Sequence, residues 1–317
     1  MSARRIVSVG EALIDVVTRP GGEPSEHVGG SLLNVANGVA RLGHRSSICS
    51  WWGRDAHGEL VAASIASTGA EVEPGTDSAA STSVAQATLD AEGRATYTFD
   101  LTWDLPEVTD LAGVSHVHTG SIGATLAPGG AKVVDLVKTL RETATISYDP
   151  NVRPAIMGTP ADVLGRVEAL VALSDVVKAS DEDLEWLYPG VPVETALRRW
   201  VDLGPTLAVC TRGPLGAYAM LRTSRDHLVV PQNTVALADT VGAGDSFMAG
   251  LISGLTDAGL LGGPVQRERL GAATWPQLAT ALHRAVVTSS ITVSRAGAYA
   301  PSLEEVRAVI AADPYLA

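Results

Sequence analysis

Short apolar runs alternate with helix-spaced stretches along most of the chain. Residues 4–9 form one such run, which ends at Gly10, and similar runs occupy residues 46–51, 116–119, 145–148, 175–178 and 207–210. Between them, apolar residues recur at helical spacing, as in 31–42, 131–141 and 161–173. Short runs bounded by turn residues are typical of strands buried on both faces, and the spaced pattern is typical of amphipathic helices. The alternation predicts an α/β protein with a mainly parallel sheet between helices, and we expect Ser31 to cap the first helix.

Two segments break this alternation. Residues 16–28 contain two prolines and two glycines, and residues 82–104 contain two strand-like runs around Glu92-Gly93. The second segment is typical of a β-hairpin, in which alternate side chains share a face. The residues expected on such common faces are Val84, Gln86, Thr88, Tyr97 and Phe99. We predict a small sheet that forms a lid, inserted into a single domain spanning residues 1–317.

Composition excludes several classes of protein. Of the 317 residues 46% are hydrophobic and 18% charged, which is typical of a globular chain. The formal net charge is −12, so we expect no nucleic-acid surface. No stretch resembles a membrane span of about 20 apolar residues or a secretory leader. Cys49 and Cys210 are the only cysteines and favour a reduced, cytoplasmic protein, whereas His116 and His118 are expected to be structural.

The glycine turn before residue 245 is the strongest chemical signal. Gly242-Ala243-Gly244-Asp245 runs into a stretch with apolar residues at helical spacing, beginning at Phe247. Free N–H groups at a helix start, together with the helix dipole, form an anion site suited to a phosphoryl group. Asp245 in the first turn could take a proton from an attacking hydroxyl. Alternatively, Asp245 only stabilises the helix start and the glycines only shape the loop. The motif is neither a Walker A loop nor a GxGxxG fingerprint.

A second glycine pair lies near the start of the chain. Gly29 and Gly30 precede a helix whose first turn carries Asn34, an amide that can both donate and accept hydrogen bonds, as a polyhydroxylated ligand requires. Asp15 adds a carboxylate that could bind two neighbouring hydroxyls. The alternative is a turn with a solvated Asn34 and a turn residue at position 15.

Asp149, Asn151 and Arg153 follow a predicted strand at alternate positions. They would lie at the carboxyl edge of the sheet, where ligands of α/β proteins bind. Arg153 could bind phosphate or pair with Asp149, and a solvated turn is the alternative reading.

Together these motifs resemble the ribokinase-like sugar kinases of the phosphofructokinase B family, most closely the bacterial fructokinases. The resemblance rests on the early GG…N and the late DTVGAGDSF, in matching order and spacing over essentially the whole chain. Further agreeing pieces are VGE before Asp15, DPNVRP from Asp149, KASDED from Lys178, TRG from Thr211, and SRAGA from Ser294. The implied fold is a three-layer sandwich with a mainly parallel sheet and a small β-sheet lid.

The resemblance also implies roles for individual residues. Asp245 would be the general base, with Gly242, Ala243 and Gly244 around the transferring phosphoryl group. The sugar would contact Asp15, Gly29, Gly30 and Asn34. Beyond the family roles, Arg153 is a further candidate for substrate binding, and Tyr97, Phe99 and Trp103 could either cover the sugar or pack against their own hairpin. ATP would lie along Lys178, Ser180, Thr211, Arg212, Gly213 and Gly216. A monovalent cation such as K⁺ would lie near Asp239, Val241, Ser294 and Gly297. Mg²⁺ would bind to the phosphates of ATP, and Asp183 would contact it through a water molecule.

Four positions depart from the family pattern. Ser180 and Asp183 replace an Asn and a Glu, which would shorten or rearrange the Mg²⁺ contact. Leu32 replaces a small residue or proline and would change the floor of the sugar pocket. Val286 replaces a frequent asparagine and would leave the adenine to apolar contacts.

The resulting hypothesis is an ATP-dependent sugar kinase that acts on a primary hydroxyl of a free sugar, with fructose converted to fructose 6-phosphate. Ribose, 2-keto-3-deoxygluconate, nucleosides and sugar phosphates remain open as acceptors. A non-catalytic sugar-binding regulatory protein and an NAD-dependent sugar dehydrogenase are the alternatives from other classes. The lid strands offer edges that could pair in a homodimer.

Overall fold

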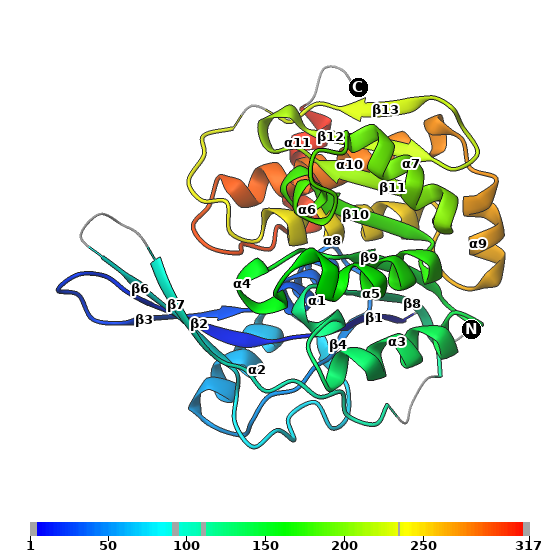
Figure 1. Ribbon diagram of the computed structural model, residues 1–317. Helices are drawn as coiled ribbons and strands as arrows, with labels where there is room; N and C mark the ends of the chain where they lie inside the picture. The colour runs from blue at the N-terminus through cyan, green and yellow to red at the C-terminus, as the bar shows by residue number, and fades with distance from the viewer. Residues whose placement is uncertain (1–4, 91–94, 109–111, 234, 313–317) are drawn as a thin grey trace.

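The central feature of the protein is a nine-stranded sheet covered by helices on both faces (Figure 1). The computed structural model describes residues 5–90, 95–108, 112–233 and 235–312. The sheet has the order β13-β12-β11-β10-β9-β8-β1-β4-β5. Its strands are β1 (Arg5–Val9), β4 (Ser46–Cys49), β5 (Glu71–Val72), β8 (Val114–Gly120), β9 (Thr145–Asp149), β10 (Val176–Ser180), β11 (Leu207–Thr211), β12 (Ala217–Leu221) and β13 (His227–Val230).

Most of this sheet is parallel, as the alternating sequence pattern predicts. Among the described strands of this sheet, only β12 runs antiparallel to its neighbours, β11 and β13, near one edge. Every residue of β1 and β9 is buried, which explains why these segments read as continuous apolar or small-residue runs. The predicted strand runs agree with the observed strands to within a few residues.

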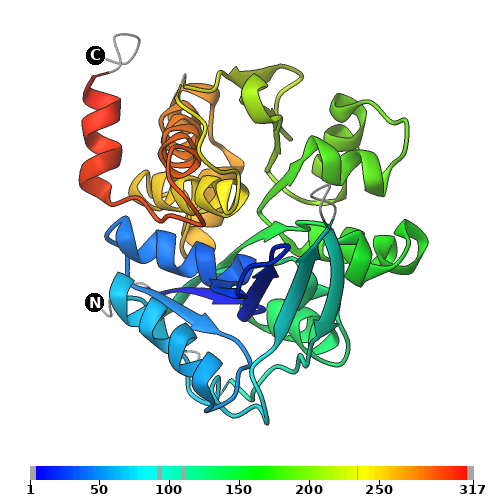
Figure 2. The same cartoon turned by 90° about the vertical axis from the view of Figure 1, so that its left-hand side faces the viewer.

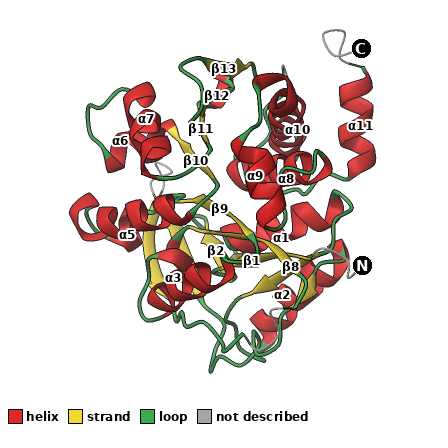
Figure 3. Ribbon diagram, turned by 90° about the vertical axis from the view of Figure 1, so that its right-hand side faces the viewer, coloured by secondary structure: helices red, strands yellow, loops and turns green. Residues whose placement is uncertain are grey.

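Helices form the two outer layers (Figure 3). One hydrophobic cluster joins the sheet to α3 (Gly129–Leu140), α5 (Pro160–Leu173), α6 (Asp181–Leu187) and α7 (Val193–Leu203). A second cluster joins the opposite face to α1 (Ser31–Arg41), α8 (Ala243–Asp257), α10 (Trp275–Val293) and α11 (Leu303–Ala311). The remaining helices are α2 (Ala56–Thr68), α4 (Pro154–Met157), α9 (Pro264–Gly271) and two short 3₁₀ turns, η1 (Ile122–Ala124) and η2 (Gly213–Leu215). This arrangement confirms the predicted three-layer α/β sandwich.

A second, four-stranded sheet projects from one side of the molecule (Figures 1 and 2). Its order is β3-β2-β6-β7, built from β2 (Leu13–Thr18), β3 (Ser25–Gly29), β6 (Val84–Leu89) and β7 (Ala95–Asp100). The two predicted segments therefore meet in one small sheet, although they lie far apart in sequence. A third apolar cluster, which includes Ile14, Leu32 and Ile65, packs this sheet against α1 and α2.

Pairing register places the hairpin side chains on specific faces of the small sheet. Ala85 lies opposite Phe99 and Ala87 opposite Tyr97, whereas Gln86 lies opposite Thr98. Tyr97 and Phe99 therefore share a face with the alanines. Val84, Gln86 and Thr88 occupy the other face, so the five residues expected on common faces divide between the two sides of the sheet.

Candidate active site

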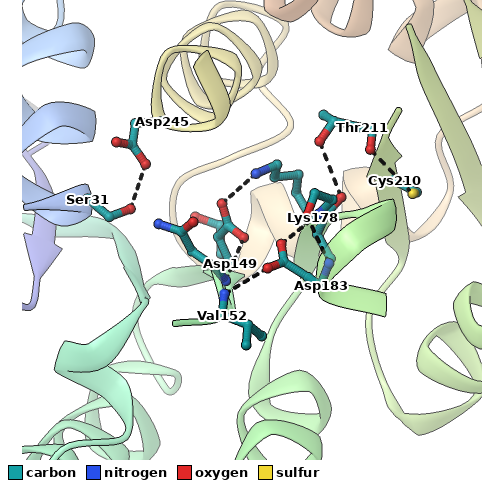
Figure 4. Close-up of polar contacts among 12 residues, drawn as sticks. Ser31, Asp149, Val152, Lys178, Asp183, Cys210, Thr211 and Asp245 are labelled. Atoms are coloured by element: carbon teal, nitrogen blue, oxygen red, sulfur yellow. Dashed lines mark hydrogen bonds and ion pairs between the residues drawn. The ribbon is translucent and has the colours of Figure 1, made fainter. Parts of the chain in front are cut away.

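The start of helix α8 faces the start of helix α1 near the carboxyl ends of β9 and β10 (Figure 4). Gly242 caps α8 with φ of 73°, a conformation that favours glycine. A Cβ atom there would also lie 2.7 Å from the Cβ of Ala298. The loop therefore needs this glycine both for its turn and for its close approach to the 294–298 segment.

Asp245 lies in the first turn of α8 and is buried. The hydroxyl of Ser31 donates to its Oδ1 at 2.6 Å, and the amide of Asn34 donates to its Oδ2 at 2.8 Å. A carboxylate that accepts two such donors is fixed in orientation and still has free lone pairs on both oxygens. The structure thus brings together two motifs that the sequence separates by about two thirds of the chain.

Ser31 is not the helix cap expected from the sequence. The N-cap of α1 is Gly30, with φ of 111°, and Ser31 is the first helical residue. The Ser31 hydroxyl therefore does not satisfy the helix start and is free to bind Asp245. Sequence reasoning missed Ser31 as a site residue, although its spacing of three from Asn34 places both on one helix face.

Glu11 is a second residue that the sequence did not single out. Its side chain is buried behind the start of α1, where Oε1 accepts the Ser31 N–H at 3.1 Å and Oε2 accepts the Gly123 N–H at 2.9 Å. Burial raises the pKa of Glu11 to about 7, against the lowering effect of these donors and of Ser121. Only its place in the VGE piece of the family resemblance pointed to it.

A buried ion pair lies beside the glycine turn. The ammonium of Lys178 in β10 contacts Oδ2 of Asp149 at 2.8 Å, and the two side chains are only 3% and 2% exposed. A Cβ at Gly244 would lie 2.8 Å from the Lys178 Nζ, so glycine at this position leaves room for the ammonium against the first turn of α8. Burial raises the pKa of Asp149 to about 6, although the adjacent Lys178 lowers it.

Asp183 has a defined structural function. It forms a capping box with Ser180 at the start of α6, accepting the Ser180 N–H at 2.8 Å, and its other oxygen accepts the Val152 N–H at 2.8 Å (Figure 4). The side chain thereby ties α6 to the loop that carries Asn151 and Arg153. Each oxygen retains a lone pair, so a metal-bound water fits this carboxylate as an outer ligand.

Asp15 and the two aromatic residues of β7, Tyr97 and Phe99, face the same side of the small sheet. Asp15 pairs with His27 on β3 and with Ala85 on β6, and Ala85 pairs with Phe99 on β7, so these side chains form one row across the sheet. Much of the Asp15 side chain is exposed, but partial desolvation raises the pKa of its carboxyl group, whereas Arg153 and His27 lower it. The electrostatic effect of Arg153 indicates that it lies near this face.

The two aromatic side chains of β7 form an open platform. Tyr97 is 56% and Phe99 36% exposed, and their rings stack with centroids 6.0 Å apart. Trp103, by contrast, is buried in the core and donates from its indole to the Gly123 carbonyl at 2.8 Å. The expectation that Trp103 covers the sugar with the other two aromatics is therefore wrong.

The glycines of the early pair are required by close contacts. A Cβ at Gly29 would overlap the Asp15 carboxylate, and a Cβ at Gly30 would lie 2.5 Å from the Glu11 carbonyl oxygen. Leu32, which follows this pair, is fully buried in the third apolar cluster. Its side chain fills the space over Gly10, where a Cβ would lie 2.5 Å from the Leu32 Cγ.

The residues expected to lie along ATP follow strand β11. Thr211 is the last residue of the strand. After it the Arg212 N–H donates to the Gly216 carbonyl at 2.8 Å and closes a turn, within which Gly213 adopts φ of 49°. The side chain of Val286 is buried in the second cluster. Lys178 and Ser180 lie on the neighbouring strand β10, where Ser180 pairs with Thr211. The residues expected along ATP on these two strands therefore lie toward the same carboxyl end of the sheet.

Asp239 braces two loops near the glycine turn. Its Oδ1 accepts the Val241 N–H at 3.1 Å and its Oδ2 accepts the Gly297 N–H at 2.8 Å. These backbone hydrogen bonds lower the pKa of Asp239. The hydroxyl of Ser294 donates within its own helix end, to the Ile291 carbonyl at 2.7 Å. Of the residues expected around a monovalent cation, the Asp239 carboxylate thus joins Val241 to Gly297, whereas the Ser294 side chain is held by its own helix.

Two further features concern alternatives raised by the sequence. His116 and His118 are buried, their pKa values lowered by burial to about 3, and both contact the Ser147 hydroxyl at 2.9 Å. Within the described ranges, no cluster of three or more His, Cys, Asp or Glu side chains could hold a metal ion. No described helix is long and apolar enough to cross a membrane.

Comparison with known proteins gives a consistent match. Residues 3–305 match the family described as pfkB family carbohydrate kinase. The chain is 30% identical over 269 residues to the fructokinase of Rhizobium leguminosarum bv. trifolii, covering 81% of each sequence. Its structure resembles that of a fructokinase with bound ATP from Xylella fastidiosa, with a TM-score of 0.84, 25% identity and coverage of 97% and 98% of the two chains.

A more distant likeness concerns the fold alone. The aminoimidazole riboside kinase from Salmonella enterica is 20% identical and has a TM-score of 0.76, with coverage of 96% of this chain and 99% of that one. Since that protein was solved with aminoimidazole riboside, the fold by itself does not select one acceptor.

Proposed function

We propose that this chain, which belongs to the pfkB family of carbohydrate kinases and is an ATP-dependent sugar kinase, phosphorylates a primary hydroxyl of a free ketohexose, converting fructose to fructose 6-phosphate. The observation that carries the catalytic part of this proposal is the Asp245 carboxylate. It is held by Ser31 and Asn34 at a helix start that is suited to phosphate.

The proposed reaction begins with a hydrogen bond from the acceptor hydroxyl to a free lone pair of Asp245. As the sugar oxygen bonds to the γ-phosphorus of ATP, the hydroxyl proton passes to the carboxylate and the bond to the β-phosphate oxygen breaks. Backbone N–H groups from Gly242 to Gly244 and the dipole of α8 stabilise the charge on the transferring phosphoryl group. Lys178 supplies an ammonium beside the same turn.

A divalent metal would act on the donor phosphates. Mg²⁺ bound there would neutralise charge on the β- and γ-phosphates, and Asp183 is the side chain suited to a bound water. For the monovalent cation we propose the loops joined by Asp239, with backbone carbonyls near Val241 and between Ser294 and Gly297 as ligands. The support is the pair of hydrogen bonds by which Asp239 holds these loops together.

Assignment of a free sugar follows from the small sheet and the relatives. Asp15 could bind two neighbouring hydroxyls, and Tyr97 and Phe99 offer an apolar platform for a sugar ring. Gly29, Gly30 and Arg153 complete the proposed pocket. The fructokinase relatives favour fructose over ribose or 2-keto-3-deoxygluconate. The fixed carboxylate of Asp245 favours an enzyme over a non-catalytic sugar-binding protein.

We also propose that residues 1–317 form one kinase domain, in which the small sheet acts as a lid. The lid segments are about 16–28 and 82–104. Strands β3 and β7 form the edges of the small sheet. Such edges could pair with a second copy, so a homodimer through the lid is part of the proposal. The two buried, free cysteines fit a reducing cytoplasm.

Replacement of Asp245 by asparagine tests the function directly. The Asp245→Asn variant should lose at least ~100-fold in kcat, measured as phosphoryl transfer from ATP to fructose, because the amide cannot accept the proton. Asp257→Asn, at the other end of α8, is the matched control and should retain turnover. Near-normal turnover of Asp245→Asn would overturn the assignment of the base.

A panel of acceptor sugars compared by kcat/KM tests the identity of the sugar. A preference for ribose or 2-keto-3-deoxygluconate would correct the assignment of fructose.

A further inference from the structure

Helices α1 and α8 pack along a close seam that ends at Asp245. At Gly38 a Cβ would lie 2.6 Å from the Cβ of Ala249, so the two helices touch with no room for a larger side chain. Asn34 and Asp245 lie one helical turn before these two residues, on the same faces. This close packing places the first turn of α1 against Asp245, where Ser31 and Asn34 both contact its carboxylate.

Ser31 makes the shorter of the two contacts with this carboxylate. A carboxylate can only accept, so the Ser31 hydroxyl is the donor, at 2.6 Å to Oδ1. Charge-assisted hydrogen bonds of this length are among the stronger ones in proteins. Because Asn34 occupies one lone pair on Oδ2, the two donors fix the carboxylate plane and leave one lone pair on each oxygen.

Ser31 is itself anchored from inside the protein. Its N–H donates to the buried carboxyl group of Glu11, whose second oxygen accepts the Gly123 N–H from the η1 turn after β8. A continuous series of contacts therefore runs from Gly123 through Glu11 and Ser31 to Asp245. No part of it depends on a flexible surface side chain.

We propose that Ser31 is a positioning residue for phosphoryl transfer, whose hydroxyl holds the Asp245 carboxylate in the orientation that the acceptor hydroxyl requires. The inference rests on the proposed role of Asp245 as the base. Ser31 itself contacts neither phosphate nor the reacting oxygen in this scheme. It acts only through the carboxylate.

Several charged groups lie near Asp245 and would be unchanged by the loss of the Ser31 hydroxyl. Lys178 on β10 and Asp149 on β9 both interact electrostatically with Asp245, with opposite signs, and Glu11 lies on the far side of Ser31. All of them remain in a Ser31→Ala variant. The variant removes only one donor from the buried carboxylate and leaves the Asn34 amide as the other.

The test compares kcat and KM in Ser31→Ala and Ser31→Thr. We expect Ser31→Ala to lower kcat about ten-fold, with KM for fructose and ATP changed less than about three-fold, because the hydrogen bond acts on the base and on neither substrate. Ser31→Thr keeps the hydroxyl and should restore kcat.

Two controls separate this effect from a general loss of structure. Ser46→Ala removes another buried hydroxyl that bonds α1, at the Ala36 carbonyl, without contacting Asp245, and should leave kcat unchanged. In an Asp245→Asn background, Ser31→Ala should cause no further loss of kcat. Should Ser31→Ala fail to fold, Ser31→Cys keeps the size with a weaker donor and should show a smaller loss of kcat.

The outcomes distinguish the two proposals. Unchanged turnover in Asp245→Asn would overturn the proposed base. Loss of turnover in Asp245→Asn, together with a Ser31→Ala kcat that matches those of the wild type and of Ser46→Ala, would leave the base in place and overturn the role of Ser31. An equal loss on Ser31→Ala with and without Asp245 would also overturn it.

Discussion

The buried carboxyl group of Glu11 should make folding stability depend on pH in a direction that is unusual for a glutamate. Most paired carboxylates have a lowered pKa and stabilise the fold above it. Burial instead raises the pKa of Glu11 from 4.5 to about 7. The folded state therefore binds the Glu11 proton more tightly than the unfolded chain does. Its contribution to stability is complete below about pH 4.5 and is lost as pH rises through 7.

The size of this effect follows from the same shift. A rise from 4.5 to about 7 corresponds to about 3 kcal/mol in the free energy of unfolding, at about 1.4 kcal/mol per pH unit. The local contacts explain how the protonated form is held. Ser121 bonds the carboxyl group and can accept from a protonated oxygen, whereas the Gly123 and Ser31 N–H groups bond either form.

Glu11→Gln removes this titration while keeping the size of the side chain. The amide places an NH₂ group near a backbone N–H, so the variant is expected to differ from the wild type by a constant offset. Beyond this constant offset, the unfolding free energy of Glu11→Gln minus that of the wild type should rise by about 3 kcal/mol between pH 4.5 and pH 8, because only the wild type loses stability over this range. The assay is urea unfolding at half-unit pH intervals, with the difference between variants plotted against pH.

A second glutamate provides a control of opposite sign. Backbone hydrogen bonding to Ser302 lowers the pKa of Glu305 at the start of α11. Its contribution is present above its unfolded pKa and is lost at lower pH, so Glu305→Gln should approach the wild type only in acid. A Glu11→Gln difference that stays flat from pH 4.5 to 8 would refute the reasoning on Glu11.

Three further changes test the close contacts around the site. Gly244→Ala places a Cβ 2.8 Å from the Lys178 ammonium, and should lower kcat/KM for ATP about ten-fold while Gly271→Ala, with open space around it, retains activity. Leu32→Ala should lower the free energy of unfolding by about 2–5 kcal/mol, measured in urea, without changing KM for fructose, because Leu32 is a core residue. Asp239→Ala should release the Gly297 loop and abolish any activation by K⁺, measured as kcat against KCl at constant ionic strength.

Much of the fold could be predicted because its strands are buried on both faces. A strand such as β9 has no solvent-exposed side chains, so its sequence is a short run of small or apolar residues with a sharp end at Asp149. Helices between such runs show the spaced pattern because only one side faces the sheet. These signals are local, and the structure confirms the α/β sandwich that they imply.

Details that depend on contacts between distant segments could not be predicted. Ser31 looks like a helix cap because serine is common there, but the cap is Gly30 and the hydroxyl binds a residue far along the chain. Leu32 departs from the family pattern, but the sequence does not reveal that its side chain lies over Gly10 in the core. Trp103 follows the predicted lid hairpin in the sequence, whereas its indole is buried and donates to the Gly123 carbonyl.

The net charge of −12 raises a question about how such a protein binds a polyanionic nucleotide, and the buried pair offers a physical answer. Lys178 is 3% exposed, so water screens its ammonium far less than it screens the surface carboxylates. Asp149 neutralises part of that charge, but its raised pKa shows that ionisation of the carboxylate is costly there. A phosphoryl group beside Gly244 would meet this ammonium and the start of α8 at short range. Field strength at that point therefore depends on a few fixed groups nearby and hardly on the sum of charges over the surface.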